Sequence, residues 1–141
     1  MCGICGIFDA EEQGESLGPL VRRMASAIAH RGPEDEGFYL SPLCVLGHRR
    51  LKIIDLSPLG RQPMSNEDET VWVSFNGEIY NYLELRAGLV RSGHHFRSQT
   101  DTEVLVHLYE EKGEKFLNEL NGMYAIALWD NRRRRLPTSL R

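Results

Sequence analysis

The sequence contains no run of eighteen apolar residues, and its N-terminus lacks a basic segment followed by an apolar block. These two absences argue against a membrane span and against a secretory signal. Positive and negative charges nearly balance, with a formal net charge of −3, so nothing favours a nucleic-acid or anionic-membrane partner. The three cysteines, Cys2, Cys5 and Cys44, are too few and odd in number for a disulfide framework. We therefore expect a reducing compartment, the cytoplasm.

Internal repeats and low-complexity linkers are also missing, which leaves a single globular domain as the expectation. The chain has 141 residues, of which 41% are hydrophobic and 26% are charged. A chain of this length buries roughly two-thirds of its surface on folding, enough for one sizeable core.

Hydrophobic periodicity predicts strands and helices that are segregated along the chain. Strands are expected at 4–9, at 37–40 and 43–48 as a hairpin, at 71–75 and at 123–129. A helix near residues 16–31 should have one apolar face, with Leu20, Met24 and Ile28 at i, i+4 and i+8 and Val21 and Ala25 beside them. Further helices are expected at 82–91 and from about 102 to 112. Such segregation favours an α+β fold.

The C-terminal segment departs from this pattern. After the strand at 123–129, residues 132–135 should lead into a return strand, but Pro137 follows and would interrupt a ladder of hydrogen bonds. We therefore expect the closing strands to be missing, which would leave an open sheet edge. A frameshift, a premature stop or a fragment would explain such a tail.

Cys2 carries the strongest chemical signal. If Met1 is removed, Cys2 bears both a thiol and a free α-amine. A free thiol ionises near pKa ~8.5 and needs a base at neutral pH, and an α-amine titrating near ~8 can be that base. A nucleophile paired with the terminal amine is a known catalytic arrangement. A cysteine at position 2 is more often an ordinary small residue, so other residues must support this interpretation.

Cys2 and Cys5 also form a C-x-x-C pair, which leaves two other interpretations open. A zinc site would need a second pair of ligands, and only Cys44 and scattered histidines remain. A redox pair of the thioredoxin type should follow a strand and open a helix. Neither context is present, so we predict no metal in this chain.

Transfer of an acyl group from an amide also needs an oxyanion site and groups that hold the substrate. Asn76 and Gly77 can donate N–H groups to an oxyanion, although Asn-Gly alone is usually a plain turn. For an amino-acid substrate, Arg50 can grip the α-carboxylate at two points, and Asp101, with Glu78, can bind the α-ammonium. Each of these charges taken alone is usually surface decoration.

Five segments together resemble the class II glutamine amidotransferase domain, and most closely the glutamine-hydrolysing asparagine synthetase subgroup. They are residues 1–9 (MCGICGIFD), 30–37 (HRGPEDEG), 47–56 (GHRRLKIIDL), 75–81 (FNGEIYN) and 101–104 (DTEV). Five blocks in the family's order are far more specific than any one of them. The resemblance covers residues 1–136, so we predict an incomplete amidotransferase domain there, a divergent tail at 137–141 and no synthetase domain.

The resemblance implies a role for each matching residue. Cys2 would be the nucleophile, with Asn76 and Gly77 as the oxyanion hole. Arg50 would bind the glutamine carboxylate, and Glu78 and Asp101 would bind its amino group. Leu51, Ile53 and Ile54, which are apolar enough to be buried, would contribute backbone to the pocket. Cys5 stands where many members have a small residue, and we expect a buried thiol without a role.

The resemblance also implies a fold, a reaction and partners. The family fold is the N-terminal-nucleophile (Ntn) hydrolase sandwich of four αββα layers with antiparallel sheets. L-glutamine would be hydrolysed here, and the ammonia would reach aspartate in a synthetase domain that uses ATP and Mg. No cofactor is expected in this chain, and a homo-oligomer is left open. Two alternatives remain: a related enzyme with a sugar or peptide acceptor, and a non-catalytic remnant, which an intact Met1 would favour.

Overall fold

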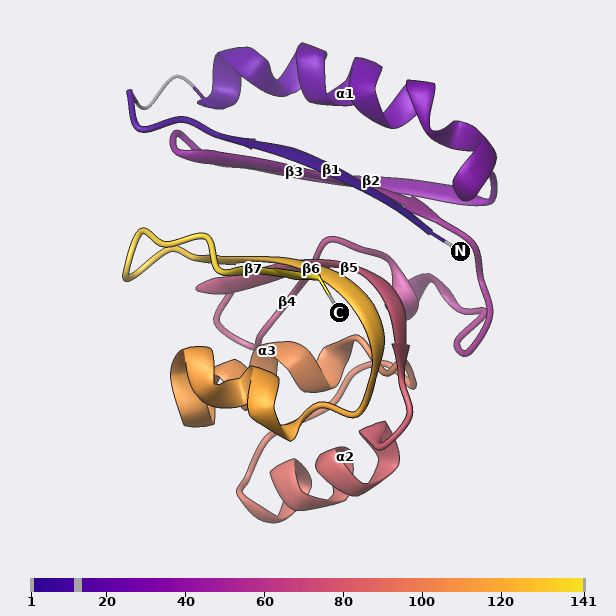
Figure 1. Ribbon diagram of the computed structural model, residues 1–141, viewed down its shortest axis with the longest axis vertical. Coiled ribbons are helices and arrows are strands. Elements are labelled where there is room, and N and C mark those ends of the chain that lie inside the picture. Colours follow the sequence, from indigo (N-terminus) through magenta and orange to yellow (C-terminus); the bar gives the residue numbers. More distant parts are fainter. Residues whose placement is uncertain (1, 12–13, 141) are drawn as a thin grey trace.

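A computed structural model describes residues 2–11 and 14–140 and shows four layers in the order helix, sheet, sheet, helix (Figure 1). In chain order the elements are β1 (Gly3–Phe8), η1 (Gly14–Leu17), α1 (Gly18–Ala27), η2 (Ala29–Arg31), β2 (Asp35–Leu40), β3 (Cys44–Arg50), η3 (Pro58–Gly60), β4 (Met64–Ser65), β5 (Val71–Ile79), α2 (Tyr82–Arg91), α3 (Glu103–Lys112), η4 (Gly113–Glu119), β6 (Gly122–Asp130) and β7 (Thr138–Leu140). The α+β prediction and the antiparallel sandwich are confirmed.

The two sheets are antiparallel. The first has the order β1-β3-β2, and the second has the order β4-β5-β6-β7. Helix α1 covers the outer face of the first sheet, and α2 and α3 cover the outer face of the second (Figure 1). None of the helices in the described part of the chain is long and apolar enough to cross a membrane.

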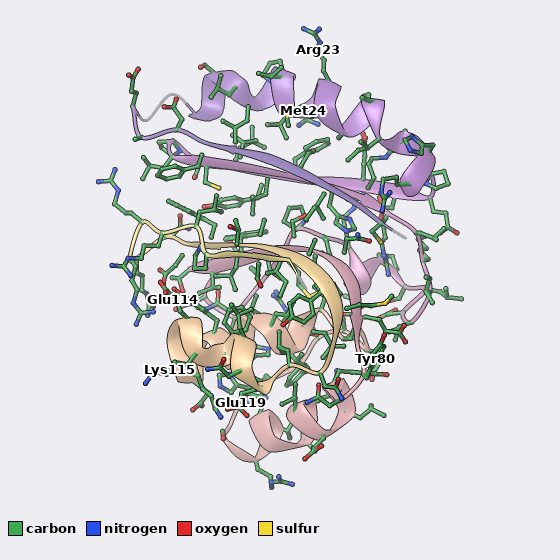
Figure 2. All side chains as sticks on the ribbon, viewed as in Figure 1. Arg23, Met24, Tyr80, Glu114, Lys115 and Glu119 are labelled. Atoms are coloured by element: carbon green, nitrogen blue, oxygen red, sulfur yellow. The ribbon has the colours of Figure 1, made fainter. Side chains whose placement is uncertain are left out.

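Helix α1 forms where its pattern predicts, and its apolar face is buried except at Leu20. Val21 and Ala25 are fully buried and Met24 and Ile28 are half-buried, whereas Leu20 is 45% exposed. The chain enters the helix through η1, with Leu17 at the N-cap position. Arg23, on the outer face, points away from the sheet (Figure 2).

Helices α2 and α3 have the predicted ends. Leu89 of α2 is buried, and α3 buries Val104, Leu105 and Leu108. Gly113 follows α3 with φ +57, a positive φ that residues other than glycine rarely adopt. The main hydrophobic core lies between these helices and the second sheet.

The two sheets are joined by apolar and polar contacts. Trp129 of β6 packs with Cys44 and Leu46 of β3 in a smaller core cluster. His48 of β3 is fully buried, and its Nε2 lies 3.0 Å from the Phe75 carbonyl oxygen of β5. Burial lowers the pKa of His48 to about 4, so the ring is neutral at pH 7 and its Nε2–H donates this bond.

The strand β7 corrects one prediction about the C-terminal end. Residues Thr138, Ser139 and Leu140 pair antiparallel with Ala127, Ile126 and Ala125 of β6, so a short return strand forms after Pro137. The proline precedes the strand, and its carbonyl accepts a hydrogen bond from Leu128 N (3.1 Å). Proline interrupts a ladder only where its missing N–H is needed, and before the first paired residue it is tolerated.

Candidate active site

One pocket of about 210 Å³ collects all nine residues that the sequence predicts for the site. They come from the start of β1, the end of β3 and the loop after it, the middle of β5 and the segment before α3. The nine residues are Cys2, Arg50, Leu51, Ile53, Ile54, Asn76, Gly77, Glu78 and Asp101. The nine side chains therefore line the same pocket, and the role of each is still a prediction.

The thiol of Cys2 lies against the backbone of a residue 49 positions away. The Leu51 amide donates to Cys2 Sγ at 3.4 Å, and the same sulfur lies 3.7 Å from the Leu51 carbonyl oxygen. Arg31 Nε donates to the Cys2 carbonyl at 3.0 Å. The pairing of β1 with β3, in which Gly3 faces Arg49, brings Cys2 beside the end of β3.

Arg50 is a buried cation held by carbonyl oxygens. Its side chain is 4% exposed, Nη1 donates to Ser57 O at 2.8 Å, and Nη2 donates to Asp55 O. Neither partner carries a formal charge. The guanidinium is therefore fixed in direction while its positive charge is not neutralised by these two bonds, which suits an anion entering the pocket.

The loop that holds Arg50 is itself anchored by the Asp55 carboxylate. Oδ2 accepts from Gln99 N at 2.9 Å, and Oδ1 accepts from Ser57 N at 2.8 Å. The Gln99 amide first, and then the Ser57 groups, lower the pKa of Asp55. Asp55 also lines the pocket, although the sequence reasoning did not select it.

Asn76 and Gly77 lie inside β5, so the predicted end of the strand at a turn is wrong. They pair with Ala125 and Tyr124 of β6, and β5 continues to Ile79. A Cβ on Gly77 would meet the Met123 carbonyl oxygen and the Tyr124 Cα. The glycine is therefore needed for close approach of two strands, and Asn-Gly is here a strand dipeptide lining the pocket.

The Asn76 amide has a buried oxygen without a hydrogen-bond partner in the described part of the chain. Buried polar atoms are normally paired, and exceptions concentrate at functional sites. The neighbouring backbone is positioned by His48, which holds the Phe75 carbonyl from the other sheet. Sequence reasoning missed this histidine because nothing in a lone His48 indicates its partner.

Asp101 provides a buried carboxylate to the pocket. Its side chain is 5% exposed, and Oδ2 accepts from Ile79 N at 3.0 Å. Burial raises the pKa of Asp101, and the negative charge of Glu78 adds to this rise. Glu78 itself is exposed at the pocket rim.

The apolar residues of the loop after β3 are less buried than predicted. Ile53 is 71% exposed and Ile54 is 40% exposed, while Leu51 is half-buried. They line the open side of the pocket instead of entering a core. Hydrophobicity alone cannot distinguish a core position from the apolar wall of a binding site.

Gln62 is a further pocket residue that the sequence reasoning missed. It is 6% exposed, its Oε1 accepts from Phe75 N at 2.7 Å, and its Nε2 donates to Thr102 Oγ1 at 3.1 Å. It thus ties β5 to the residue at the N-cap position of α3, next to Asp101. Residues 61–69 have a polar, loop-like composition, so no local signal indicates this role.

The two other cysteines lie outside the pocket. Cys5 Sγ lies 3.8 Å from the Val21 carbonyl oxygen beneath α1, and burial raises the pKa of its thiol. It is half-buried, not fully buried as predicted. Burial raises the pKa of Cys44 to about 12. Both thiols are therefore protonated and poorly nucleophilic at neutral pH.

Comparison with known proteins identifies relatives of this arrangement. A sequence profile described as "Glutamine amidotransferase domain" matches residues 1–139. "Asparagine synthetase [glutamine-hydrolyzing] 2" of Bacillus subtilis (strain 168) is 44% identical over 138 residues, which cover 96% of this chain and 18% of that protein. "Asparagine synthetase [glutamine-hydrolyzing]" of Sandersonia aurantiaca is 43% identical over 132 residues, which cover 94% and 25%.

A solved structure shows the same fold at lower sequence similarity. Glutamine phosphoribosylpyrophosphate amidotransferase from B. subtilis matches with a TM-score of 0.64 and 21% identity, covering 92% of this chain and 35% of that one. At this identity the likeness shows the fold alone. The chain spans about a fifth to a quarter of the length of the two synthetases named above.

Proposed function

The chain belongs to the glutamine amidotransferase domain family, and from that premise we propose that its pocket hydrolyses glutamine to glutamate and ammonia. One observation carries the proposal. The thiol of Cys2, the strand dipeptide Asn76–Gly77, the cation of Arg50 and the carboxylate of Asp101 line one pocket, although up to 99 positions separate them in sequence.

The charged groups define how glutamine would bind. Arg50, held by two carbonyl oxygens, would bind the α-carboxylate of glutamine. Asp101, with Glu78 at the rim of the pocket, would bind the α-ammonium. An amino acid held at both charges keeps one direction for its side chain. The side-chain amide would then extend toward Cys2, with the loop of Leu51, Ile53 and Ile54 forming the wall.

The proposed chemistry uses protein groups and water. Met1 lies outside the described part of the chain. Once it is removed, the α-amine of Cys2 takes the proton of the Cys2 thiol. The thiolate attacks the amide carbon, and Asn76 NH₂ and Gly77 N–H stabilise the oxyanion. The ammonium returns its proton to the leaving nitrogen, ammonia departs, and a thioester remains. Water, deprotonated by the same amine, hydrolyses the thioester and releases glutamate.

We further propose that the ammonia serves asparagine synthesis from aspartate. Both relatives named above are glutamine-hydrolysing asparagine synthetases by name, and this supports aspartate as the acceptor over a sugar or peptide. A synthetase domain would be the partner and would use ATP and Mg, whereas glutamine hydrolysis here would use no cofactor. We place the protein in the cytoplasm and leave open a homo-oligomer.

The test is labelling with 6-diazo-5-oxo-norleucine, a glutamine-analogue electrophile, followed by intact-mass measurement. We expect the purified chain to lack Met1 and to gain one adduct that maps to Cys2. Glutamate and ammonia should form from glutamine at a rate that Cys2→Ala abolishes. Cys5→Ala is the matched control, because Cys5 lies three residues later, on β1 and outside the pocket, and it should keep labelling and activity.

Two results would contradict the proposal. A mature protein that retains Met1 and gains no adduct would indicate a non-catalytic remnant, because Cys2 would then have no free amine. An adduct at Cys5 or Cys44 that leaves Cys2 unmodified would remove Cys2 from the nucleophilic role.

A further inference from the structure

A second group of chemically reactive side chains lies outside the glutamine pocket. Glu67 comes from the loop between β4 and β5, His94 follows α2, and His107 and Glu110 lie on α3. One ligand atom from each of the four side chains lies within 4.8 Å of the corresponding atoms of the others. None of these four residues lines the glutamine pocket.

The distances around His107 are close to the edge of a tetrahedron around a zinc ion. Zn–N and Zn–O bonds of about 2.0–2.1 Å at tetrahedral angles place neighbouring ligand atoms about 3.3 Å apart. His107 Nδ1 lies 3.2 Å from Glu110 Oε2 and 3.4 Å from Glu67 Oε2. His94 Nδ1 lies farther out, 3.7 Å from Glu110 Oε2 and 3.8 Å from Glu67 Oε1, the other oxygen of that carboxylate, so His94 and Glu67 would have to shift to complete the tetrahedron.

The outer contacts of the histidines also suit a metal site. Both turn Nδ1 toward the two carboxylates and present Nε2 to a further carboxylate. His94 Nε2 lies 3.1 Å from Glu111 Oε1, a hydrogen-bond distance, whereas His107 Nε2 lies 3.9 Å from Glu103 Oε1 and makes no hydrogen bond within the described residues. Histidines that bind metals commonly direct the second ring nitrogen toward a carboxylate, which fixes the ring and raises its basicity.

The two carboxylates are likewise held in place. Glu110 Oε1 accepts from Asn66 Nδ2 at 2.8 Å, and this leaves Oε2 for the cluster. Glu67 Oε1 accepts from the His95 backbone amide at 3.1 Å. Few rotamers therefore need to be frozen when a cation enters, which lowers the entropic cost of binding.

Burial and charge favour a cation at this position. His107 is 1% exposed, so its imidazole is almost entirely removed from water. Two carboxylates share the cluster with the two imidazoles, and two more face the outer ring nitrogens. With neutral imidazoles the cluster has an excess of negative charge that a divalent ion would offset.

We propose that Glu67, His94, His107 and Glu110 form a structural site for a divalent transition metal ion, Zn²⁺ in the first place. Nitrogen and carboxylate ligands suit zinc, and four protein ligands give the closed coordination of a structural site. The ion would replace the proton that joins His107 Nδ1 to Glu110 in the metal-free form.

The site would clamp three segments that are distant in sequence. It joins the loop before β5, the segment after α2 and the middle of α3. His107 lies four residues after Glu103, the first residue of α3, or about 6 Å along the helix axis. A metal there would steady the helix whose N-terminal end presents Asp101 to the glutamine pocket.

The experiment measures zinc binding to the 141-residue chain by competition with a chromophoric chelator. We expect one zinc ion per chain, and at a free zinc concentration of 100 times Kd the Tm should rise by about 5–10 °C. His94→Ala should weaken binding by about 100-fold or more. His94 is the chosen ligand because its side chain is 15% exposed, so the variant should fold.

Three measurements serve as controls. His95→Ala removes an exposed neighbouring histidine whose side chain lies outside the cluster, and it should bind zinc within about threefold of the parent chain. Cys2→Ala should also keep the site, although a thiol with a terminal amine can bind zinc. Cobalt(II) in place of zinc should give the strong visible absorption of four-coordinate nitrogen and oxygen ligation, and His94→Ala should abolish it.

Three outcomes would overturn the proposal. The first is that the parent chain binds no zinc, the second is that His94→Ala and His95→Ala bind zinc equally, and the third is that only Cys2→Ala abolishes zinc binding. The first would mean that the cluster is a set of imidazolium–carboxylate ion pairs. The last would move the metal to the N-terminus.

Discussion

Replacing Asn76 with alanine should separate catalysis from folding in this domain. The buried Oδ1 of Asn76 has no hydrogen-bond partner in the described part of the chain, so truncation removes no hydrogen bond that this oxygen makes within the fold. Removing an unpaired buried polar atom is close to neutral for stability. We therefore expect the free energy of unfolding to change by less than about 1 kcal/mol.

Catalysis should respond very differently. In the proposed mechanism the Asn76 amide donates to the oxyanion, which exists only after the thiolate has attacked. Loss of one such donor costs about 2.7–4 kcal/mol of transition-state stabilisation, or about 100–1000-fold in kcat. The KM for glutamine should change little, because the ground-state contacts belong to Arg50 and Asp101.

The assay pairs glutaminase kinetics with thermal unfolding on the same preparations. Ser74→Ala is the matched control, because Ser74 lies two residues earlier on the same strand and face. Its Oγ donates to Gly47 O at 3.3 Å across the two sheets. Losing that bond should cost about 1 kcal/mol, or about 4 °C in Tm, and leave kcat within about twofold.

The reasoning would be refuted if Asn76→Ala kept kcat within tenfold of the parent chain. It would also fail if Asn76→Ala lowered Tm as much as Ser74→Ala or more. In that case the loss of activity would follow from damage to the fold.

Three further predictions concern the pocket. Arg50→Lys should raise the KM for glutamine about 10–100-fold in steady-state assays, because one ammonium cannot keep both carbonyl bonds and still grip a carboxylate. Burial raises the pKa of Asp101. The KM for glutamine should rise as the pH falls through that raised pKa, because a protonated Asp101 no longer attracts the α-ammonium. Asp101→Asn should have a high KM that does not depend on pH in this range. The raised pKa means that the folded state binds this proton more tightly than the unfolded state does. The ionised carboxylate therefore lowers the stability of the folded state at pH values above its folded pKa. In urea unfolding at pH 7, Asp101→Asn should be at least as stable as the parent chain. Gly77→Ala should lose activity, and its free energy of unfolding should fall by about 2–3 kcal/mol in the same assay, because the new Cβ would meet Met123 and Tyr124. Unchanged stability would contradict the close approach of β5 and β6.

Much of the fold follows from local sequence patterns. Helix α2 has the predicted bounds, α3 ends at the predicted residue, and β6 forms over the strand predicted at 123–129. These features depend on periodicity and turn chemistry, which act over a few residues. The chemical inventory of the site is equally local, since a thiol beside an α-amine needs no neighbour to be recognised.

Burial could not be predicted in the same way. Leu20 and Ile53 are hydrophobic but exposed, whereas the smaller Val21 and Ala25 are buried against the first sheet. Which side of α1 faces that sheet is decided by the packing of the helix on it. Hydrophobicity specifies that a residue gains by leaving water, and only packing decides which residues do so.

Tertiary pairing alone decided the character of Asn76 and Gly77. Their local signal is a turn, yet β6 pairs with both of them and extends β5 to Ile79. The same long-range pairing between β1 and β3 brings Cys2 to Leu51, and Gln62 and His48 then fix the neighbouring backbone. Sequence alone determined which reactive groups this protein has. The register of two sheets, set by contacts between residues far apart in the chain, determined that these groups share one pocket.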